Sequence, residues 1–224
     1  MVANERASWE RYAPLTGVAA VVLWVIGVII GESGGARPED ERAENILAWY
    51  ADNENTIITS ELIYVLGVLF FIWFLGSLRS RLVAVEGGTG RVSSIAFGSG
   101  LLVALAMIIG AAALIQPTFA DEGELSGEAA QAMSTLSDGM FGVVEVTLIP
   151  MLVATALVIL RHGTLPRWLA WVSLLLALLL AIIPIGWLGV IFGFPLWVLV
   201  TSVLLYMRSG GEPVAARPPT LQTD

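Results

Sequence analysis

The fold class follows from one apolar stretch of the chain, IITSELIYVLGVLFFIWFLGS, which comprises residues 57–77. It holds 21 residues and only one charged side chain, that of Glu61. A helix rises about 1.5 Å per residue and therefore needs about 20 apolar residues to cross the hydrocarbon core of a bilayer. The stretch predicts a transmembrane helix.

Further apolar stretches predict an all-α, polytopic bundle of six transmembrane helices. The other five spans are residues 13–31, 92–115, 139–160, 166–183 and 187–207. The last two come from one apolar region that is too long for a single helix, even a tilted one. Pro184, Gly186 and Gly189 predict the turn that divides it. One spanning helix followed by a broken one is the alternative interpretation.

The domain organisation is simple. Residues 1–208 are expected to form a single transmembrane domain. Residues 209–224 are rich in glycine, proline and polar side chains, and this composition predicts a disordered cytoplasmic tail. The overall composition agrees with a membrane protein, because only 13% of the residues are charged and the mean hydropathy is +0.82. Soluble domains carry about 25% charged residues.

Residues that the chain lacks exclude several kinds of chemistry. There is no cysteine, so thiol catalysis and Cys-ligated metal centres are excluded. There is no lysine to form a Schiff base, and the single histidine, His162, cannot supply the two ligands of a bis-histidine haem. Enzyme motifs are also missing. We therefore expect no enzyme activity, no cofactor and no metal site. The net charge of −8 argues against a nucleic acid partner.

The arginines predict the orientation in the membrane. Nine of the eleven flank the predicted spans on one side, while Arg37 and Arg42 lie on the other side among many acidic residues. The nine are Arg6, Arg11, Arg79, Arg81, Arg91, Arg161, Arg167, Arg208 and Arg217. Short arginine-rich loops stay in the cytoplasm, so both termini are expected inside, at a bacterial plasma membrane. A cleaved signal peptide is the competing interpretation of the first span, although its apolar core is longer than about 15 residues.

The two acidic outer loops carry helical patterns of their own. In the first loop an apolar stripe with spacing i, i+3, i+4, i+7 consists of Ala43, Ile46, Leu47 and Tyr50. In the second loop, Ser126 is expected to cap a weaker amphipathic helix. We expect these short helices to cover the ends of the bundle. A surface for a protein partner is the alternative.

Small and aromatic residues predict how the spans pack. Gly27 and Gly31, Gly189 and Gly193, and a face around Gly100 predict close contacts between helices within the chain. Five tryptophans near predicted helix ends are interpreted as interfacial anchors. They are Trp73, Trp168, Trp171, Trp187 and Trp197.

One polar site is predicted inside the membrane region. Ionisable groups there are costly and therefore often functional. We expect Glu61, Gln116, Asp138 and Glu145 to converge on an outward-facing pocket between the second, third and fourth helices, with Tyr64 one turn below Glu61. No basic residue lies within the predicted spans to neutralise Glu145. The group would bind a proton, a small cation or a polar substrate, or it would be a protonated side chain that only bridges helices.

Two stretches of the chain carry a resemblance. Residues 61–82, ELIYVLGVLFFIWFLGSLRSRL, and residues 163–180, GTLPRWLAWVSLLLALLL, resemble segments of a family of small, uncharacterised bacterial integral membrane proteins with six helices and a domain of unknown function. The resemblance implies the six-helix layout and a plasma-membrane location. It implies no activity and no site residues.

Two function classes follow from these observations. The first is a transporter or channel for a small solute, a cation or protons that uses the acidic pocket. The second is a non-catalytic assembly or accessory protein that binds a partner through its outer amphipathic helix. Membrane lipid is an expected partner in both classes. A small cation or proton, a protein partner and a second copy of the chain stay open.

Overall fold

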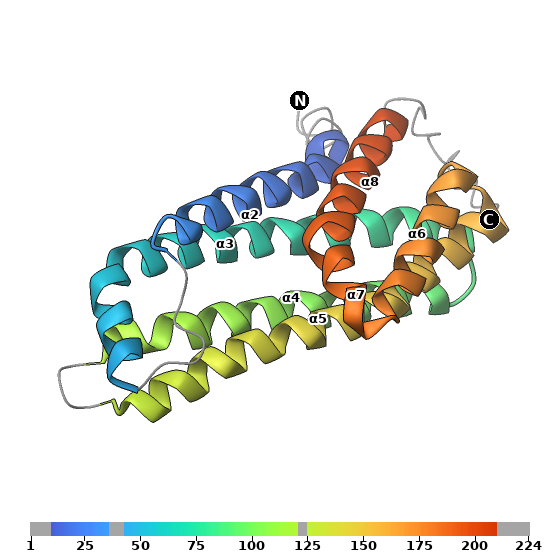
Figure 1. Ribbon diagram of the computed structural model, residues 1–224. Helices are drawn as coiled ribbons and strands as arrows, with labels where there is room; N and C mark the ends of the chain where they lie inside the picture. The colour runs from blue at the N-terminus through green and yellow to red at the C-terminus, as the bar shows by residue number, and fades with distance from the viewer. Residues whose placement is uncertain (1–9, 36–42, 121–124, 210–224) are drawn as a thin grey trace, which may run out of the picture.

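A computed structural model describes residues 10–35, 43–120 and 125–209 (Figure 1), and within these ranges there is no strand. Most of the predicted tail, residues 210–224, lies outside them, as do the parts of the outer loops at residues 36–42 and 121–124. The all-α bundle is confirmed. The elements in chain order are η1 (Ala13–Leu15), α2 (Thr16–Glu32), α3 (Ala43–Glu86), α4 (Arg91–Ile115), η2 (Gln116–Phe119), α5 (Gly127–His162), α6 (Arg167–Leu180), α7 (Ile183–Leu188), the π-helix η3 (Gly189–Gly193) and α8 (Phe194–Ser209).

Five helical stretches are long and apolar enough to cross a membrane. They are Glu10–Glu32, Asn45–Glu86, Arg91–Phe119, Gly127–His162 and Ile185–Arg208. Large apolar side chains cover their outer surfaces: Leu102 of α4 is 52% exposed and Val146 of α5 is 66% exposed. Contact between such side chains and water costs free energy, whereas contact with lipid tails does not. These helices are compatible with a multi-pass integral membrane protein.

The predicted outer helices are continuous with the spans that follow them. α3 begins at Ala43 and α5 at Gly127, so each extends well beyond the predicted transmembrane stretch. In Figure 1 the first turns of α3 bend over the ends of α4 and α5. Ile46 and Tyr50, each 2% exposed, pack in a cluster with Ala130 of α5. The apolar stripe therefore covers the end of the bundle, as expected. The Ser126 hydroxyl accepts a hydrogen bond from the Ala129 N–H at 3.2 Å, which confirms the predicted cap.

The first and last described helices meet at the opposite end of the bundle. The rings of Tyr12 and Tyr206 stack with their centroids 5.8 Å apart, and the Arg11 guanidinium lies over the Tyr206 ring. The Arg208 side chain donates a hydrogen bond to the Thr164 carbonyl in the loop before α6. Both described ends of the chain thus lie on the same side.

Glu86 joins two helices at this end. Its carboxylate accepts hydrogen bonds from the N–H groups of Val92 and Ser93, at 2.8 and 2.7 Å, and from the Ser93 hydroxyl. The first turn of an α-helix has N–H groups with no partner in the helix, so the last residue of α3 caps α4.

The glycine seams are confirmed as contacts within the chain. A side chain at Gly27 of α2 would lie 3.0 Å from the Ser60 carbonyl of α3, and one at Gly100 of α4 would lie 2.7 Å from Leu75. A side chain at Gly193 would press against Leu176 of α6. Because these positions lack a Cβ, the backbones can approach closely and gain dispersion contacts that lipid does not offer.

One tryptophan does not fit its predicted role. Trp73, Trp168, Trp171 and Trp187 are exposed, but Trp197 is only 2% exposed. Its indole N–H donates a buried 2.8 Å hydrogen bond to the Ser173 hydroxyl and so links α8 to α6. The interpretation of Trp197 as an interfacial anchor is therefore wrong, because its residue number near a predicted helix end did not reveal which face it occupies.

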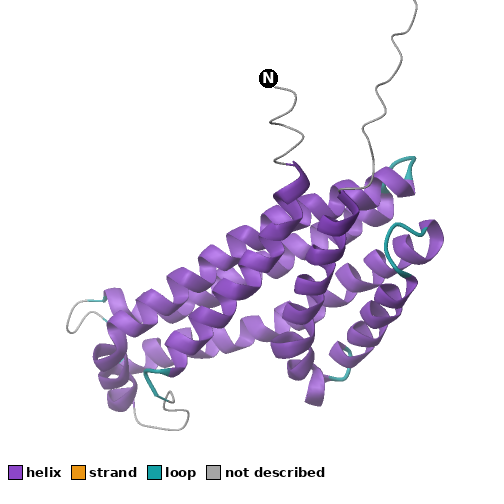
Figure 2. Ribbon diagram, turned by 90° about the horizontal axis from the view of Figure 1, so that it is seen from above, coloured by secondary structure: helices purple, strands orange, loops and turns teal. Residues whose placement is uncertain are grey.

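The last three helices form a hairpin beside one half of the bundle. Figure 1 shows α6, α7 and α8 near the end where the N-terminus is marked, while α3, α4 and α5 reach the other end. Figure 2 shows the bundle from above, with all its described elements helical. The predicted break near Pro184 is confirmed, since α6 ends at Leu180 and α7 begins at Ile183. Two full spans are not found, because α6 has only 14 residues. Its length of about 21 Å is less than the roughly 30 Å hydrocarbon core.

Candidate functional site

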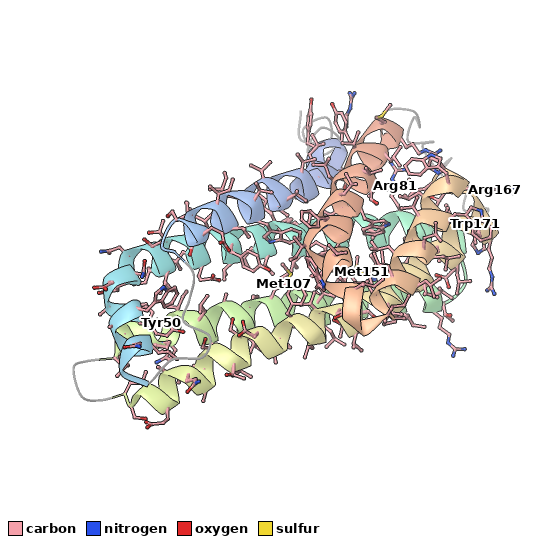
Figure 3. All side chains as sticks on the ribbon, in the orientation of Figure 1. Tyr50, Arg81, Met107, Met151, Arg167 and Trp171 are labelled. Atoms are coloured by element: carbon pink, nitrogen blue, oxygen red, sulfur yellow. The ribbon has the colours of Figure 1, made fainter. Side chains whose placement is uncertain are left out.

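Glu145 lies in the middle of α5 and points into the protein. The residue is 9% exposed, and its Oε1 has no hydrogen-bond partner among the described residues. Further along α5, the side chains of Met151 and Leu152 are fully buried. Figure 3 shows Met107 of α4 and Met151 of α5 in the same central region. A carboxyl group is thus enclosed in an apolar interior.

The carboxyl group of Glu145 packs against α7. A Cβ built at Gly186 would overlap Glu145 Oε1 and would lie 2.6 Å from its carboxyl carbon. The same point lies 3.1 Å from the carbonyl oxygen of Leu180, the last residue of α6. The side-chain oxygen of Glu145 and the backbone oxygen of Leu180 are therefore neighbours, and only a glycine at position 186 leaves room for them.

The break between α6 and α7 removes the usual helical partner of the Leu180 carbonyl. The N–H groups of Ala181 and Ile182 bond back to Ala177 and Leu179, and those of Ile185 and Gly186 both bond to the Ile182 carbonyl. In an uninterrupted helix the Leu180 carbonyl would accept from the N–H four residues later. That residue is Pro184, which has no N–H.

Glu61 and Tyr64 lie on α3, next to α2. Both are half-buried. The Tyr64 ring lies 6.4 Å from the Trp24 ring, and a side chain at Gly27 would be 3.2 Å from the Tyr64 Cβ. Tyr64 therefore packs in the contact between α2 and α3, one helical turn from Glu61.

Gln116 and Asp138 are both exposed. Gln116 begins η2 at the end of α4, so the predicted end of that helix is confirmed. Asp138 lies on the same face of α5 as Glu145, about 10 Å from it along the helix axis. The convergence of Glu61, Gln116, Asp138 and Glu145 on one pocket stays a prediction. The structure adds α7 as the neighbour of Glu145, which the predicted pocket did not include.

The sequence contains a signal for the contact between Glu145 and α7, although by itself this signal indicates only a turn. Pro184 and Gly186 mark a break in an apolar region, and breaks at membrane depth line sites more often than smooth helices do. No periodicity connects this break to Glu145, because the two lie in different helices.

The arrangement has few chemical options. No group of three or more histidine, aspartate or glutamate side chains that could hold a metal ion occurs in the described part of the chain. The site offers one carboxyl group, one backbone carbonyl oxygen and a close-packed glycine. Such a set can take part in hydrogen bonds.

Comparisons with models of protein families, with curated proteins and with solved structures give no match for the chain. The resemblance of residues 61–82 and 163–180 to small six-helix bacterial membrane proteins stays a prediction.

Proposed function

We propose that this chain is a multi-pass integral membrane protein that couples the movement of protons to that of a small solute, with Glu145 as the group that binds the proton. The observation that carries the proposal is the buried carboxyl oxygen of Glu145, which has no hydrogen-bond partner beside a broken helix. A carboxylate without a cationic partner is costly in an apolar interior, and ionisable groups at such places in membrane proteins often belong to proton pathways.

The helix break supports this function as well. Transporters commonly bind ions and substrates where a membrane helix is interrupted, because the freed backbone carbonyls become ligands. The α6–α7 break supplies such a carbonyl at Leu180. Within the proposal, the exposed side chains of Gln116 and Asp138 and the half-buried Glu61 and Tyr64 line the route by which protons or solute reach Glu145 from outside.

The assembly-protein alternative receives less support. It required the apolar stripe of the first outer helix to be free for a partner. Ile46 and Tyr50 of that stripe are instead buried against α5 within the chain. A partner would have to recognise the polar face of the segment.

The orientation belongs to the same proposal. We place both termini in the cytoplasm of a bacterium and the bent start of α3 outside. The seven arginines of the described ranges support this, since they lie at the ends of α2–α6 and α8 that meet near Tyr12 and Tyr206, with Arg81 and Arg167 labelled in Figure 3.

The proposal predicts proton flux that depends on Glu145. The purified protein would be placed in liposomes with a pH-sensitive dye inside, under an imposed pH gradient and with a panel of small solutes. Glu145→Gln should reduce the solute-dependent flux to the rate of protein-free liposomes, because an amide cannot exchange a proton. Glu128→Gln, at an exposed acid in the first turn of α5, is the control and should keep the flux. Unchanged flux in Glu145→Gln would rule out the proposed role.

A further inference from the structure

The two oxygens at the α6–α7 break would repel each other unless a hydrogen atom lay between them. Glu145 Oε1 and the Leu180 carbonyl oxygen flank the same point beside Gly186. Both are hydrogen-bond acceptors when the carboxyl is ionised, and two acceptors in contact repel each other. A protonated carboxyl group has an O–H that can donate to the carbonyl oxygen.

We infer that a protonated Glu145 donates a hydrogen bond to the Leu180 carbonyl, so that the break between α6 and α7 forms the second half of a proton-binding site. The inference rests on the proposed function for its purpose, but its geometry can be tested without any transport measurement. It assigns a role to three features that the sequence placed apart: a carboxyl group on α5, a proline that removes an N–H, and a glycine that leaves space.

The site selects a proton over a metal cation. Hard metal cations in proteins take about six or more oxygen ligands. Beside Gly186 the oxygens shown are those of one carboxyl group and the Leu180 carbonyl, fewer than such a cation needs, and the glycine backbone itself lies against the carboxyl group. A proton needs one donor oxygen and one acceptor oxygen, and it needs no further space.

Few charged groups lie near Glu145 to compete with the Leu180 carbonyl for its carboxyl group. The elements that pack on α5 are α3, α4, η2, α6, α7 and η3. Between residues 92 and 120 and between residues 168 and 193, α4, η2, α6, α7 and η3 carry no titratable side chain. On α3 the titratable groups of the central part are Glu61 and Tyr64, and Tyr64 packs toward α2. No cation faces Glu145 from these segments.

The bond would couple protonation to the position of the hairpin. With the proton present, α5 is tied to the last carbonyl of α6. After the proton leaves, the two oxygens repel each other. This repulsion favours separation of the α6–α7 turn from α5. A proton-linked transporter requires such a difference between its protonated and deprotonated forms.

Infrared spectroscopy of the intact protein in lipid nanodiscs tests the hydrogen bond directly. The C=O stretch of a protonated carboxylic acid is identified as the band that disappears in Glu145→Gln. In Gly186→Ala the new Cβ would displace Oε1 from the Leu180 carbonyl, so the band should shift to that of an acid with a weaker hydrogen bond. Gly142→Ala, also near Glu145 but with open space around the added Cβ, is the matched control and should leave the band in place.

A second measurement keeps the inference falsifiable if Gly186→Ala does not fold. Glu145→Gln retains an N–H donor for the Leu180 carbonyl, whereas Glu145→Leu has a similar size and no donor. The melting temperature of Glu145→Leu should lie about 3 °C or more below that of Glu145→Gln. Equal melting temperatures, or a band that does not move in folded Gly186→Ala, would overturn the inference.

The two proposals can fail separately. A shifted band in Gly186→Ala together with no proton flux in wild-type liposomes would keep the hydrogen bond and remove the transport function. Glu145-dependent flux together with an unmoved band would keep the function and remove the bond to Leu180.

Discussion

At the scale of single residues, several buried hydroxyl groups of the bundle bond to a carbonyl of their own helix. Thr155 donates to Met151 at 2.8 Å and Ser60 to Ile57 at 3.0 Å. The hydrogen bond from Trp197 to Ser173 is different, because it connects α8 to α6, and the Ser173 hydroxyl in turn donates to the Leu169 carbonyl. In a membrane interior no water can replace such partners.

The link between Ser173 and Trp197 predicts an unequal effect of two similar substitutions. Ser173→Ala should lower the free energy of unfolding by about 1 kcal/mol, because it leaves the buried indole N–H without an acceptor. Ser80→Ala removes a comparable bond within a helix, to the Gly76 carbonyl, at an exposed position of α3. It should have little effect. Thermal unfolding of both variants in one detergent checks this, and equal midpoints would show that the interhelical bond contributes nothing measurable.

Single residues also show how far the sequence could predict the site. Glu145 stands out because it is a lone acid in an apolar run, so its importance could be predicted. Its neighbour Gly186 could not, since a glycine can mark a close contact without showing which residue of another helix it meets. For the same reason, the tryptophans could be placed along the chain but Trp197 could not be assigned to the interior.

At the scale of elements, the apolar runs located every long helix and both ends of α4, but not the starts of α3 and α5. The polar residues 51–56, ADNENT, separate the apolar stripe from the predicted span, yet α3 continues through them. Polar side chains on the outer face of a helix do not interrupt it, and Asn53 even bonds back to the Trp49 carbonyl at 2.9 Å. The end of α6 at Leu180 was equally hidden, because the residues after it are as apolar as those before it.

The start of α3 should detach when its buried face is made charged. Ile46→Asp would place a carboxylate in the cluster with Tyr50 and Ala130, so the segment should leave the end of the bundle. Amide hydrogen exchange in residues 43–56 should become about tenfold faster or more, with the central helices unaffected. Ala48→Asp, at an exposed position of the same segment, is the control. Equal exchange in both variants would mean that the cluster does not hold the segment.

At the scale of the whole molecule, the charges divide the bundle into two unlike ends. The described arginines lie at the end with Tyr12 and Tyr206, and the start of α3 at the other end carries Asp52 and Glu54. This arrangement could be predicted from residue counts alone, because alternate loops of a bundle must lie on alternate sides. The path of α6–α8 beside only one half of the bundle could not be predicted, since it depends on how side chains pack.

The absence of native cysteines allows a clean test of orientation. Thr89→Cys lies in the turn between α3 and α4, and Asp52→Cys lies on the exposed face near the start of α3. In intact bacterial cells an impermeant thiol reagent should label Asp52→Cys and leave Thr89→Cys unlabelled until the membrane is opened. Labelling of both in intact cells, or of Thr89→Cys alone, would contradict the proposed orientation.

The short α6 has a consequence for the lipid around the protein. α6 has 14 residues, whereas the helices beside it are long enough to span the hydrocarbon core. Acyl chains next to α6 meet a hydrophobic surface shorter than the one they meet elsewhere on the protein, and this mismatch is relieved when the bilayer becomes thinner at that side. The headgroup region of one leaflet would then dip toward the α6–α7 turn. The protein would thus thin the bilayer beside α6. Water would then reach the proton site over a shorter distance than the average thickness of the membrane implies.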